Sequence, residues 1–448
     1  MLHIRSTAKT SSARTDPVNT SLYRLSPGQP MPHFSMPRLR PDVAILLLRA
    51  AGLFLKLGLT VFIARYMGMT SVAHYGYIAA AAAILPIALG FGMIQDLGRQ
   101  LVTNGLLAII PTLRCYWRCV CALYLVAALL LAACLPAGFE LRPLHVVLAT
   151  VILVLEHLNN DAYFILSNLR RPLFSNLQMF VRAAGWIAVY IPAAFLFSPL
   201  RSTTALLLFW LGGLFAAWCM FLASCPAYRQ HEARLQPHCL ADMRQRLGRN
   251  TTLYLGEAAN ASAVHIDRYV VGLAMGHVAA GIYVLFSSVA TGIYTLVNTT
   301  VMHVARPVLI AHHAGGRHFH FRQVHARALR RTALLGATIA LLVAVAVHAA
   351  LPLLGRPDIA MQESTLHILL LATVIRAISD MQGYVFYTQR LDRLFLYTAL
   401  FTVATYLAAS ALLLPLAGLA GAAAAVACAF TATLGLRSCL IRRQRELE

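Results

Sequence analysis

The stretch that decides the fold runs from Leu57 to Gly98 and reads LGLTVFIARYMGMTSVAHYGYIAAAAAILPIALGFGMIQDLG. It holds the end of one apolar segment, a turn at Met67-Gly68, and a second apolar segment that begins near Tyr75. Each full segment has about 20 residues or more, the length that an α-helix needs to cross a bilayer. A glycine lets the first helix end abruptly, and a tyrosine suits the membrane–water boundary. The stretch therefore predicts two transmembrane helices joined by a tight turn.

The same pattern recurs 208 residues later in the chain. Met275-Gly276 ends another apolar segment, and Tyr283 follows this glycine at the spacing that separates Tyr75 from Gly68. Internal repeats of helical bundles around a central site are typical of transporters. Because an even number of spans precedes the second copy, we expect the two halves to run in the same direction.

Apolar segments of this length occupy most of the 448 residues, of which 59% are hydrophobic and 12% charged. Soluble domains carry about 25% charged residues, so the composition excludes an ordinary soluble enzyme. A backbone inside a bilayer must satisfy its own hydrogen bonds, so each segment is predicted to be helical. The predicted fold is an all-α polytopic membrane protein of two six-helix lobes. The twelve spans are 43–67, 75–94, 116–137, 144–166, 174–197, 203–223, 251–274, 279–302, 332–353, 364–388, 394–414 and 418–436.

The segments outside the spans complete the predicted organisation. Residues 1–42 form a disordered basic tail, with Met31 and Met36 as alternative starts. The N-lobe covers 43–223, a cytoplasmic linker 224–250, the C-lobe 251–437 and a second cytoplasmic tail 438–448.

The basic residues predict the orientation of the chain. The net charge of +21 comes from 37 Lys and Arg against 16 Asp and Glu. With the N-terminus in the cytoplasm, the cytoplasmic segments hold 27 of the basic residues, the outside loops hold 3, and the spans hold the other seven. Because basic residues gather on the cytoplasmic side of membrane proteins, both termini are predicted to be cytoplasmic. This distribution explains the charge without a nucleic-acid partner, and none is expected.

Three parts of the chain resemble Wzx-like polysaccharide flippases of the MOP exporter superfamily. The stretch Leu57–Gly98, which ends in Asp96-Leu97-Gly98, is similar to the first two helices of that family. The segment from Asp267-Arg268-Tyr269 to Tyr283 resembles the start of its second lobe. The motif Pro415-x2-Gly418-x2-Gly421-Ala422-Ala423-x-Ala425 resembles its last hairpin.

This resemblance implies a V-shaped transporter of the bacterial inner membrane that works by alternating access. The implied cargo is an oligosaccharide linked to undecaprenyl diphosphate, used for O-antigen, lipopolysaccharide or exopolysaccharide synthesis. The implied partners are membrane lipids and, in the same pathway, a polymerase and chain-length proteins. The chain departs from the family in its long N-terminal tail. It also lacks the two extra helices of the peptidoglycan-precursor branch, which argues against that cargo.

Ionisable residues within spans are costly, so each is a candidate for function. Lys56 lies about 20 Å from the cytoplasmic end of its helix, and Arg49 shares its face. Both are candidates to bind the cargo phosphate in a cavity, and for both an ion pair within the lobe is the alternative. Asn160 and Arg182 are further substrate candidates, and Glu156 is a candidate for ion coupling. A helix-packing network among these last three is the alternative.

The second lobe carries a matching set of candidates. Glu257 and Asn260 are expected to face the cleft and to bind a coupling ion. Asn298 ends a polar stripe that suits either sugar binding or helix packing. Arg376 is a substrate candidate that contacts phosphate, and Asp380, four residues later, either couples an ion or forms a salt bridge with it.

Two other classes of protein remain as alternatives. A MATE-like drug or cation antiporter of the same superfamily would need a cleft dominated by acids. A membrane polysaccharide polymerase or ligase would need a long outside loop, and the predicted loops are short. No Walker A sequence, catalytic residue or cofactor motif is found, and Cys115-x3-Cys119 lacks the second pair that a zinc site needs. We therefore expect no enzyme activity, no cofactor and no metal.

Overall fold

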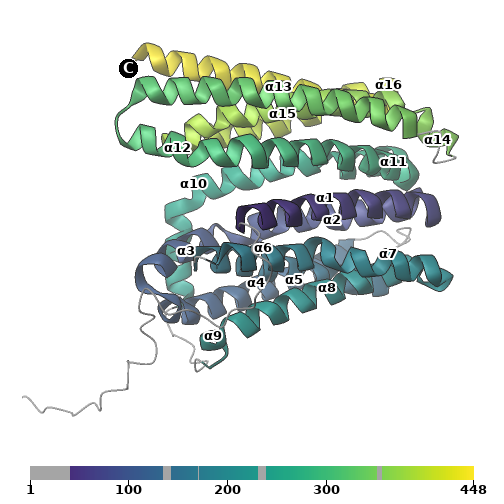
Figure 1. Cartoon of the computed structure of the whole chain (residues 1–448), viewed down its shortest axis with the longest axis horizontal. Coiled ribbons are helices and arrows are strands. Elements are labelled where there is room, and N and C mark those ends of the chain that lie inside the picture. The colour runs from purple at the N-terminus through teal and green to yellow at the C-terminus, as the bar shows by residue number, and fades with distance from the viewer. Residues whose placement is uncertain (1–40, 135–142, 170, 231–238, 351–355, 448) are drawn as a thin grey trace, which may run out of the picture. The chain divides into compact units, whose positions relative to one another are not determined.

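The computed structural model describes residues 41–134, 143–169, 171–230, 239–350 and 356–447 (Figure 1). Regular structure in these ranges is entirely helical, which confirms the predicted fold class. The predicted basic tail, apart from its last two residues, and the middle of the predicted linker lie outside the described residues.

We call the helical part of the chain from Ile45 to Ser224 the N-lobe. They are α1 (Pro41–Tyr66), α2 (Met69–Gly90), α3 (Met93–Asn104), α4 (Leu106–Cys134), α5 (Pro143–Asn168), α6 (Pro172–Phe180), the π-helical turn η2 (Val181–Gly185), α7 (Trp186–Leu196), the short 3₁₀ turn η3 (Ser198–Leu200) and α8 (Thr203–Ser224). A short helix, α9 (Pro226–Gln230), follows them.

The helices from Cys239 onward are called the C-lobe. They are α10 (Cys239–His265), α11 (Asp267–Val297), the π-helical turn η4 (Asn298–Met302), α12 (His303–Ala314), α13 (His318–Ala350), α14 (Pro357–Ala360), α15 (Glu363–Thr388) and α16 (Asp392–Leu447).

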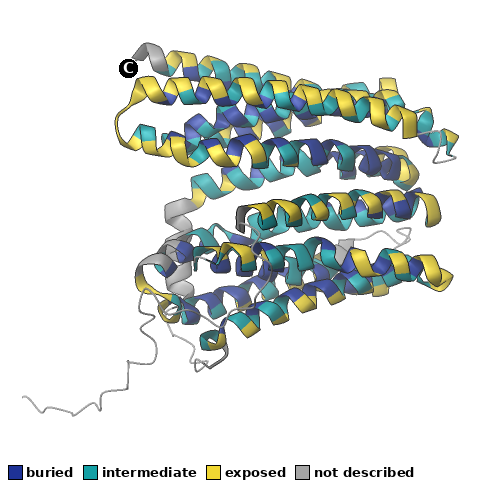
Figure 2. Ribbon diagram, viewed as in Figure 1, coloured by how far each residue is buried: buried dark blue, intermediate teal, exposed yellow. Residues whose placement is uncertain are grey.

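Ten helical stretches of the described residues are long and apolar enough to cross a membrane. Two of them contain a backbone break, at Gly276 within Thr251–Ala314 and at Ala417-Gly418 within Asp392–Gln444. Dividing these two stretches at their breaks gives twelve segments, the number that the sequence predicts. Several bounds differ, as in Leu106–Leu130 against the predicted 116–137 and His318–Ala350 against 332–353. Large apolar side chains face outward on several of these helices, and Leu129, Leu341 and Leu416 are 61%, 67% and 81% exposed (Figure 2). Side chains of this kind suit contact with lipid rather than water.

The repeated glycines have the same backbone conformation in both lobes. Gly68 has φ 90° and ψ 167°, and Gly276 has φ 82° and ψ 176°. Glycine adopts this region without steric cost, so the prediction that each glycine ends a helix is confirmed. The expectation that the tyrosine lies at a membrane–water boundary is wrong for Tyr283. Tyr283 is fully buried and donates a hydrogen bond to Asp267 Oδ2 at 2.9 Å, because its hydroxyl has a partner inside the lobe.

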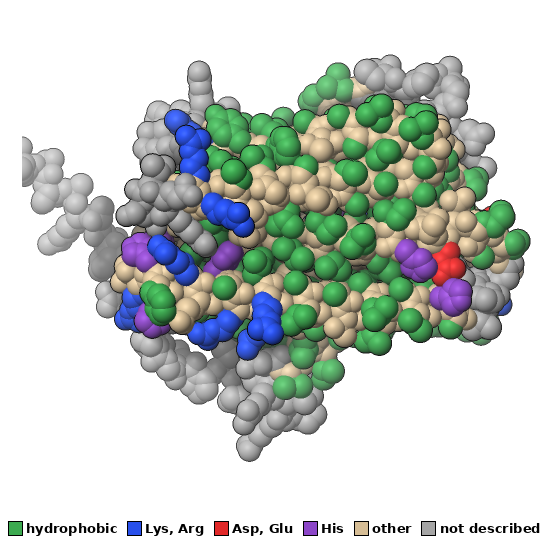
Figure 3. All heavy atoms as spheres, turned by 90° about the horizontal axis from the view of Figure 1, so that it is seen from above, with side chains coloured by type: hydrophobic (Ala, Val, Ile, Leu, Met, Phe, Trp, Pro, Cys, Tyr) green, Lys and Arg blue, Asp and Glu red, His purple; other side chains and the backbone are tan. Residues whose placement is uncertain are grey.

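The basic segment 303–331, which lies between two predicted spans, is helical, and most of its residues are exposed. It forms α12 and the first part of α13, which join through a turn at Gly315-Gly316. Phe321, His325 and Ala328 are buried on one face of α13, and this packing extends the helix beyond its apolar centre. Seen from above, Lys and Arg side chains gather toward one end of the molecular face, and hydrophobic side chains cover its middle (Figure 3).

The two lobes meet mainly along α2. Its first half packs on the part of α11 that follows Gly276, and its second half packs on α10 (Figure 1). A Cβ at Gly281 would overlap the carbonyl group of Met69, and one at Gly76 would overlap Val284. We call this side of the protein, where Gly68 and Gly276 lie, the glycine-turn end.

Candidate functional site

A cavity of about 300 Å³ lies inside the N-lobe and is called the N-lobe cavity. Helices α1, α2, α5, α7 and α8 and the π-helical turn η2 form its walls. Its lining residues are Lys56, Tyr75, Ala79, Ala82, Ala83, Pro86, Ile87, Glu156, Asn160, Arg182, Ala183, Trp186 and Trp210. Four of the residues predicted from the sequence, Lys56, Glu156, Asn160 and Arg182, are therefore brought together.

The cations of the N-lobe cavity have different environments. Glu156 Oε2 lies 3.5 Å from Arg182 Nε, and Glu156 Oε1 accepts a hydrogen bond from Trp210 Nε1 at 2.9 Å. Lys56 is exposed, and its ammonium group makes no ion pair or hydrogen bond with the described residues. An ammonium in a cavity with no carboxylate within ion-pair distance can bind an anionic ligand.

Arg182 owes its position to local helix geometry. It lies in the π-helical turn Val181–Gly185, which interrupts the span between α6 and α7. Such turns insert an extra residue into a helix and often occur at functional sites. Asn298 begins the corresponding irregularity in the C-lobe, the turn Asn298–Met302.

A second cavity, of about 420 Å³, lies on the C-lobe side and is called the C-lobe cavity. It brings together Glu257, Asn260, Arg376 and Asp380, all of them predicted from the sequence. The other lining residues are Ala83, Ile87, Ala261, Val264, His265, Tyr294, Arg306, Gly383, Tyr384, Tyr387, Phe395 and Arg437.

Asp380 is the centre of a buried charge network in this cavity. Its Oδ2 lies 3.6 Å from Arg376 Nε and accepts a hydrogen bond from the Tyr294 hydroxyl at 2.9 Å. Its Oδ1 lies 3.3 Å from Nη1 of Arg437. The predicted pair between Arg376 and Asp380 therefore exists, but two arginines share the one carboxylate. The Arg376 guanidinium also stacks over the Tyr294 ring at 3.8 Å.

Arg437 was missed by the sequence analysis, which ended the last span one residue before it. Its side chain is 2% exposed and donates to the Ser379 carbonyl at 2.8 Å. The apolar residues Leu440 and Ile441 continue beyond it, and this continuation was the signal that the helix was still inside the bundle. Arg306 lies outside the predicted spans, and its guanidinium lies 4.2 Å from the centre of the Tyr387 ring.

Glu257 differs from the other two cavity carboxylates. Its Oε2 accepts a hydrogen bond from Gln95 Nε2 of α3 at 2.9 Å, and no arginine of the described residues lies within ion-pair distance. This hydrogen bond joins the two lobes, as does the bond from the Tyr254 hydroxyl to the Ala88 carbonyl at 2.6 Å. Both lie far along α2 from the glycine-turn end.

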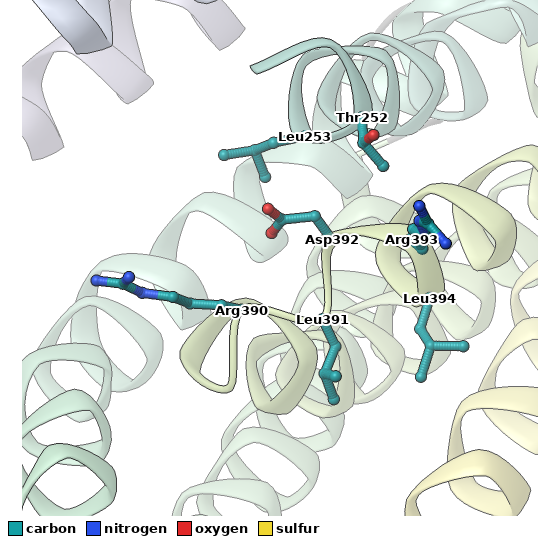
Figure 4. A pocket seen from close by; sticks show the side chains of 7 residues that line it. All are labelled: Thr252, Leu253, Arg390, Leu391, Asp392, Arg393 and Leu394. Atoms are coloured by element: carbon teal, nitrogen blue, oxygen red, sulfur yellow. The ribbon is translucent and has the colours of Figure 1, made fainter. Parts of the chain in front are cut away.

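Two predicted substrate residues line neither cavity. Arg49 Nε donates to Asn176 Oδ1 at 3.1 Å, which ties α1 to α6. Asn298 has a buried Oδ1 without a hydrogen-bond partner among the described residues. A further cavity, of about 360 Å³, is formed where α10 faces the turn between α15 and α16 (Figure 4). None of the predicted site residues lines it.

The α2 helix is the wall between the N-lobe cavity and the C-lobe cavity, because Ala83 and Ile87 line both. Each cavity holds one more cation than carboxylate. The N-lobe cavity has Lys56 and Arg182 against Glu156. The C-lobe cavity has three arginines against Glu257 and Asp380.

Solved structures are similar to this arrangement over most of its length. An inward-facing multidrug resistance MATE family transporter of the MOP superfamily is 14% identical, with a TM-score of 0.67, covering 90% of this chain and 97% of that one. The chain has the MOP transporter fold. The lipid II flippase MurJ, in an inward closed conformation, has this fold too, at 13% identity and a TM-score of 0.67, over 90% of this chain and 87% of that one.

An outward-facing MATE family transporter of the MOP superfamily is 14% identical and has a lower TM-score of 0.57, over 91% of this chain and 96% of that one. No protein-family model and no curated protein sequence matches the chain. At these identities the likeness is one of fold. The MOP transporter fold and the ten apolar helical stretches make this a multi-pass membrane protein.

Proposed function

We propose that this protein is a flippase that moves an oligosaccharide linked to undecaprenyl diphosphate across the bacterial inner membrane. The observation that carries the proposal is the excess of cations in both cavities, above all the exposed and unpaired Lys56. A diphosphate is the anionic group shared by all such cargoes. Ammonium and guanidinium groups bind it through charge-assisted hydrogen bonds, which are about twice as strong as neutral ones.

The remaining walls suit the rest of that cargo. The Trp186 and Trp210 rings of the N-lobe cavity lie 6.0 Å apart and nearly parallel, at an interplanar angle of 9°. Both side chains are buried, and they give the cavity an apolar wall beside the Asn160 amide, which can bind hydroxyl groups of sugars. The polyprenyl chain would stay in the bilayer beside the apolar outer surface. O-antigen or exopolysaccharide assembly is the process proposed to use the product, with a polymerase and chain-length proteins as later partners.

Transport would proceed by alternating access of the two lobes. In the proposed orientation both termini are cytoplasmic, so the glycine-turn end faces away from the cytoplasm. The tight contacts of Gly76 and Gly281 close that end, which supports an inward-facing or closed state. The higher TM-score with the inward-facing structures agrees with it. Labelling a cysteine placed in 303–331 from outside the cell would contradict the orientation.

Glu257 is the best candidate for ion coupling. Glu156 and Asp380 already lie within 4 Å of arginines, whereas Glu257 accepts one hydrogen bond from an amide of the other lobe. A proton or cation on Glu257 would weaken its role as acceptor from Gln95. Ion binding and lobe separation would thereby be linked through one hydrogen bond.

A MATE-like cation antiporter is the second candidate. The MATE structure fits as well as the flippase structure does, and aromatic walls with a single free carboxylate also suit an organic cation. The two functions differ in which charged residue is essential: Lys56 for an anionic cargo, Glu257 for a cationic one.

A complementation experiment in the source bacterium separates them. A strain whose only copy carries Lys56→Ala or Arg376→Ala is expected to lose surface polysaccharide at normal protein level, and Lys56→Arg is expected to retain it. Arg65→Ala, an exposed arginine on the same helix as Lys56, is the matched control. Unchanged polysaccharide in both alanine variants, or increased drug sensitivity alone, contradicts the flippase proposal.

A further inference from the structure

Arg268, the second residue of α11, is a buried cation without a bonded partner. It is 7% exposed, its Nε has no hydrogen-bond partner, and its guanidinium makes no ion pair with the described residues. The neighbouring Asp267 does not neutralise it by direct contact. Asp267 Oδ1 accepts the Arg268 backbone N–H at 2.9 Å, and its Oδ2 accepts the Tyr283 hydroxyl at 2.9 Å.

A small cavity of about 30 Å³ adjoins this guanidinium. Its polar lining consists of Asp267, Arg268, Ser287, Thr291, Thr373 and Arg376. A single water needs about 10–15 Å³ of such space, so the cavity has room for one small ion but not for a phosphoryl group. It is therefore distinct from a site for a diphosphate.

Arg376 brings a second guanidinium to the same cavity. Its Nε is buried without a hydrogen bond, and the nearest carboxylate oxygen is Asp380 Oδ2 at 3.6 Å. The hydroxyl groups of Ser287 and Thr291 donate to backbone carbonyls of their own helix at 3.1 and 2.7 Å, so their protons are already used. The donors left to face the cavity are thus the guanidinium N–H groups and the Thr373 hydroxyl.

The charged groups that line this cavity determine which kind of ion can bind in it. Two guanidinium groups face the single carboxylate of Asp267 in this cavity, and the carboxylate that pairs with Arg376, Asp380, is shared with Arg437. The cavity therefore has an excess of positive charge, which would repel a cation and which a water molecule would leave in place. Burying an uncompensated charge is costly, and a bound counter-ion removes that cost. We propose that this cavity binds one chloride-sized monovalent anion between Arg268 and Arg376.

The site adjoins the C-lobe cavity, because Val264 and Arg376 line both spaces. An anion there would lie behind Arg376 and hold its side chain against the Tyr294 ring. The proposal is independent of the identity of the cargo, since it concerns a cavity too small for any transported lipid-linked sugar.

Binding of radioactive chloride to the full-length protein in lipid nanodiscs tests this proposal. Saturable binding of one chloride per chain is expected, together with a higher thermal midpoint in sodium chloride or bromide than in sodium gluconate at equal ionic strength. Arg268→Gln should weaken chloride affinity about tenfold or more, because it removes a charged hydrogen-bond donor. Arg65→Gln, the matched control on an exposed arginine, should leave it unchanged.

Thr373→Val is a second variant that tests the cavity if Arg268→Gln does not fold. It alters the cavity wall but keeps both guanidinium groups, so chloride affinity should fall by less than in Arg268→Gln. Absence of saturable chloride binding to the wild-type protein overturns the proposal. So does an Arg268→Gln variant that is folded and binds chloride as the wild type does.

Discussion

The two cavities use similar residues in opposite ways. In the N-lobe cavity one carboxylate, Glu156, is held by Arg182 and Trp210, and Lys56 is left exposed and unpaired. In the C-lobe cavity one carboxylate, Asp380, is shared by Arg376, Arg437 and Tyr294. In the C-lobe cavity Arg376 and Arg437 thus belong to a buried network, whereas in the N-lobe cavity Lys56 has no ion-pair partner among the described residues. The charge count is alike, but stability and binding depend on different residues.

The largest expected effect concerns the buried arginine of the C-lobe. Arg437→Met should destabilise the protein by about 3–5 kcal/mol, because it breaks a buried ion pair and leaves the Ser379 carbonyl without its donor. Arg182→Met in the N-lobe should cost only about 1–2 kcal/mol, since its pair with Glu156 is partly exposed. Thermal unfolding of both variants in detergent, monitored by size-exclusion chromatography, measures this difference. Equal losses would mean that the two networks are equivalent.

The wall between the cavities gives the next effect. Gly281→Ala should destabilise the contact with α2 by about 1–3 kcal/mol, because the new methyl group meets the backbone carbonyl of Met69. Gly58→Ala is the matched control, since a Cβ there has open space and alanine favours the helix. The thermal midpoint should fall in the first variant and rise slightly in the second. An unchanged midpoint for Gly281→Ala would contradict the tight packing at the glycine-turn end.

The smallest expected loss of stability comes from removing one hydrogen-bond donor to Glu156 or to Asp380. Trp210→Phe leaves Glu156 with only Arg182, and the cost should be about 1–2 kcal/mol. Tyr294→Phe should cost less, about 0.5–1 kcal/mol, because two arginines still neutralise Asp380. Chemical denaturation of the two variants side by side tests the order. The reverse order would show that Asp380 depends on the tyrosine rather than on the arginines.

Hydropathy was sufficient to predict the fold, because a bilayer forces long apolar segments into helices. The repeat at Gly68 and Gly276 was also visible, since a backbone with positive φ requires glycine. Helix ends were less predictable. The helix α3 and the start of α13 are amphipathic, with charged residues on one face and buried residues on the other. The mean hydropathy of such a segment is low, so it does not indicate the buried face.

The site was predictable where a charge stands out in an apolar segment. Lys56, Glu257 and Arg376 all fit that description, and each lines a cavity. Arg437 lies directly after the last predicted span, so the sequence predicts it to be one of the cytoplasmic basic residues. Its burial depends on contacts with Ser379 and Asp380, 58 and 57 residues away, which no local pattern contains.

The central claim is that the free cation of the N-lobe cavity binds an anionic cargo. The most direct measurement is binding of undecaprenyl diphosphate, compared with tetraphenylphosphonium, to the purified protein in nanodiscs. We predict that the diphosphate binds, that Lys56→Ala weakens this binding about tenfold or more, and that Glu257→Gln leaves it intact. Binding of tetraphenylphosphonium that is lost in Glu257→Gln, with no binding of the diphosphate, would contradict the account.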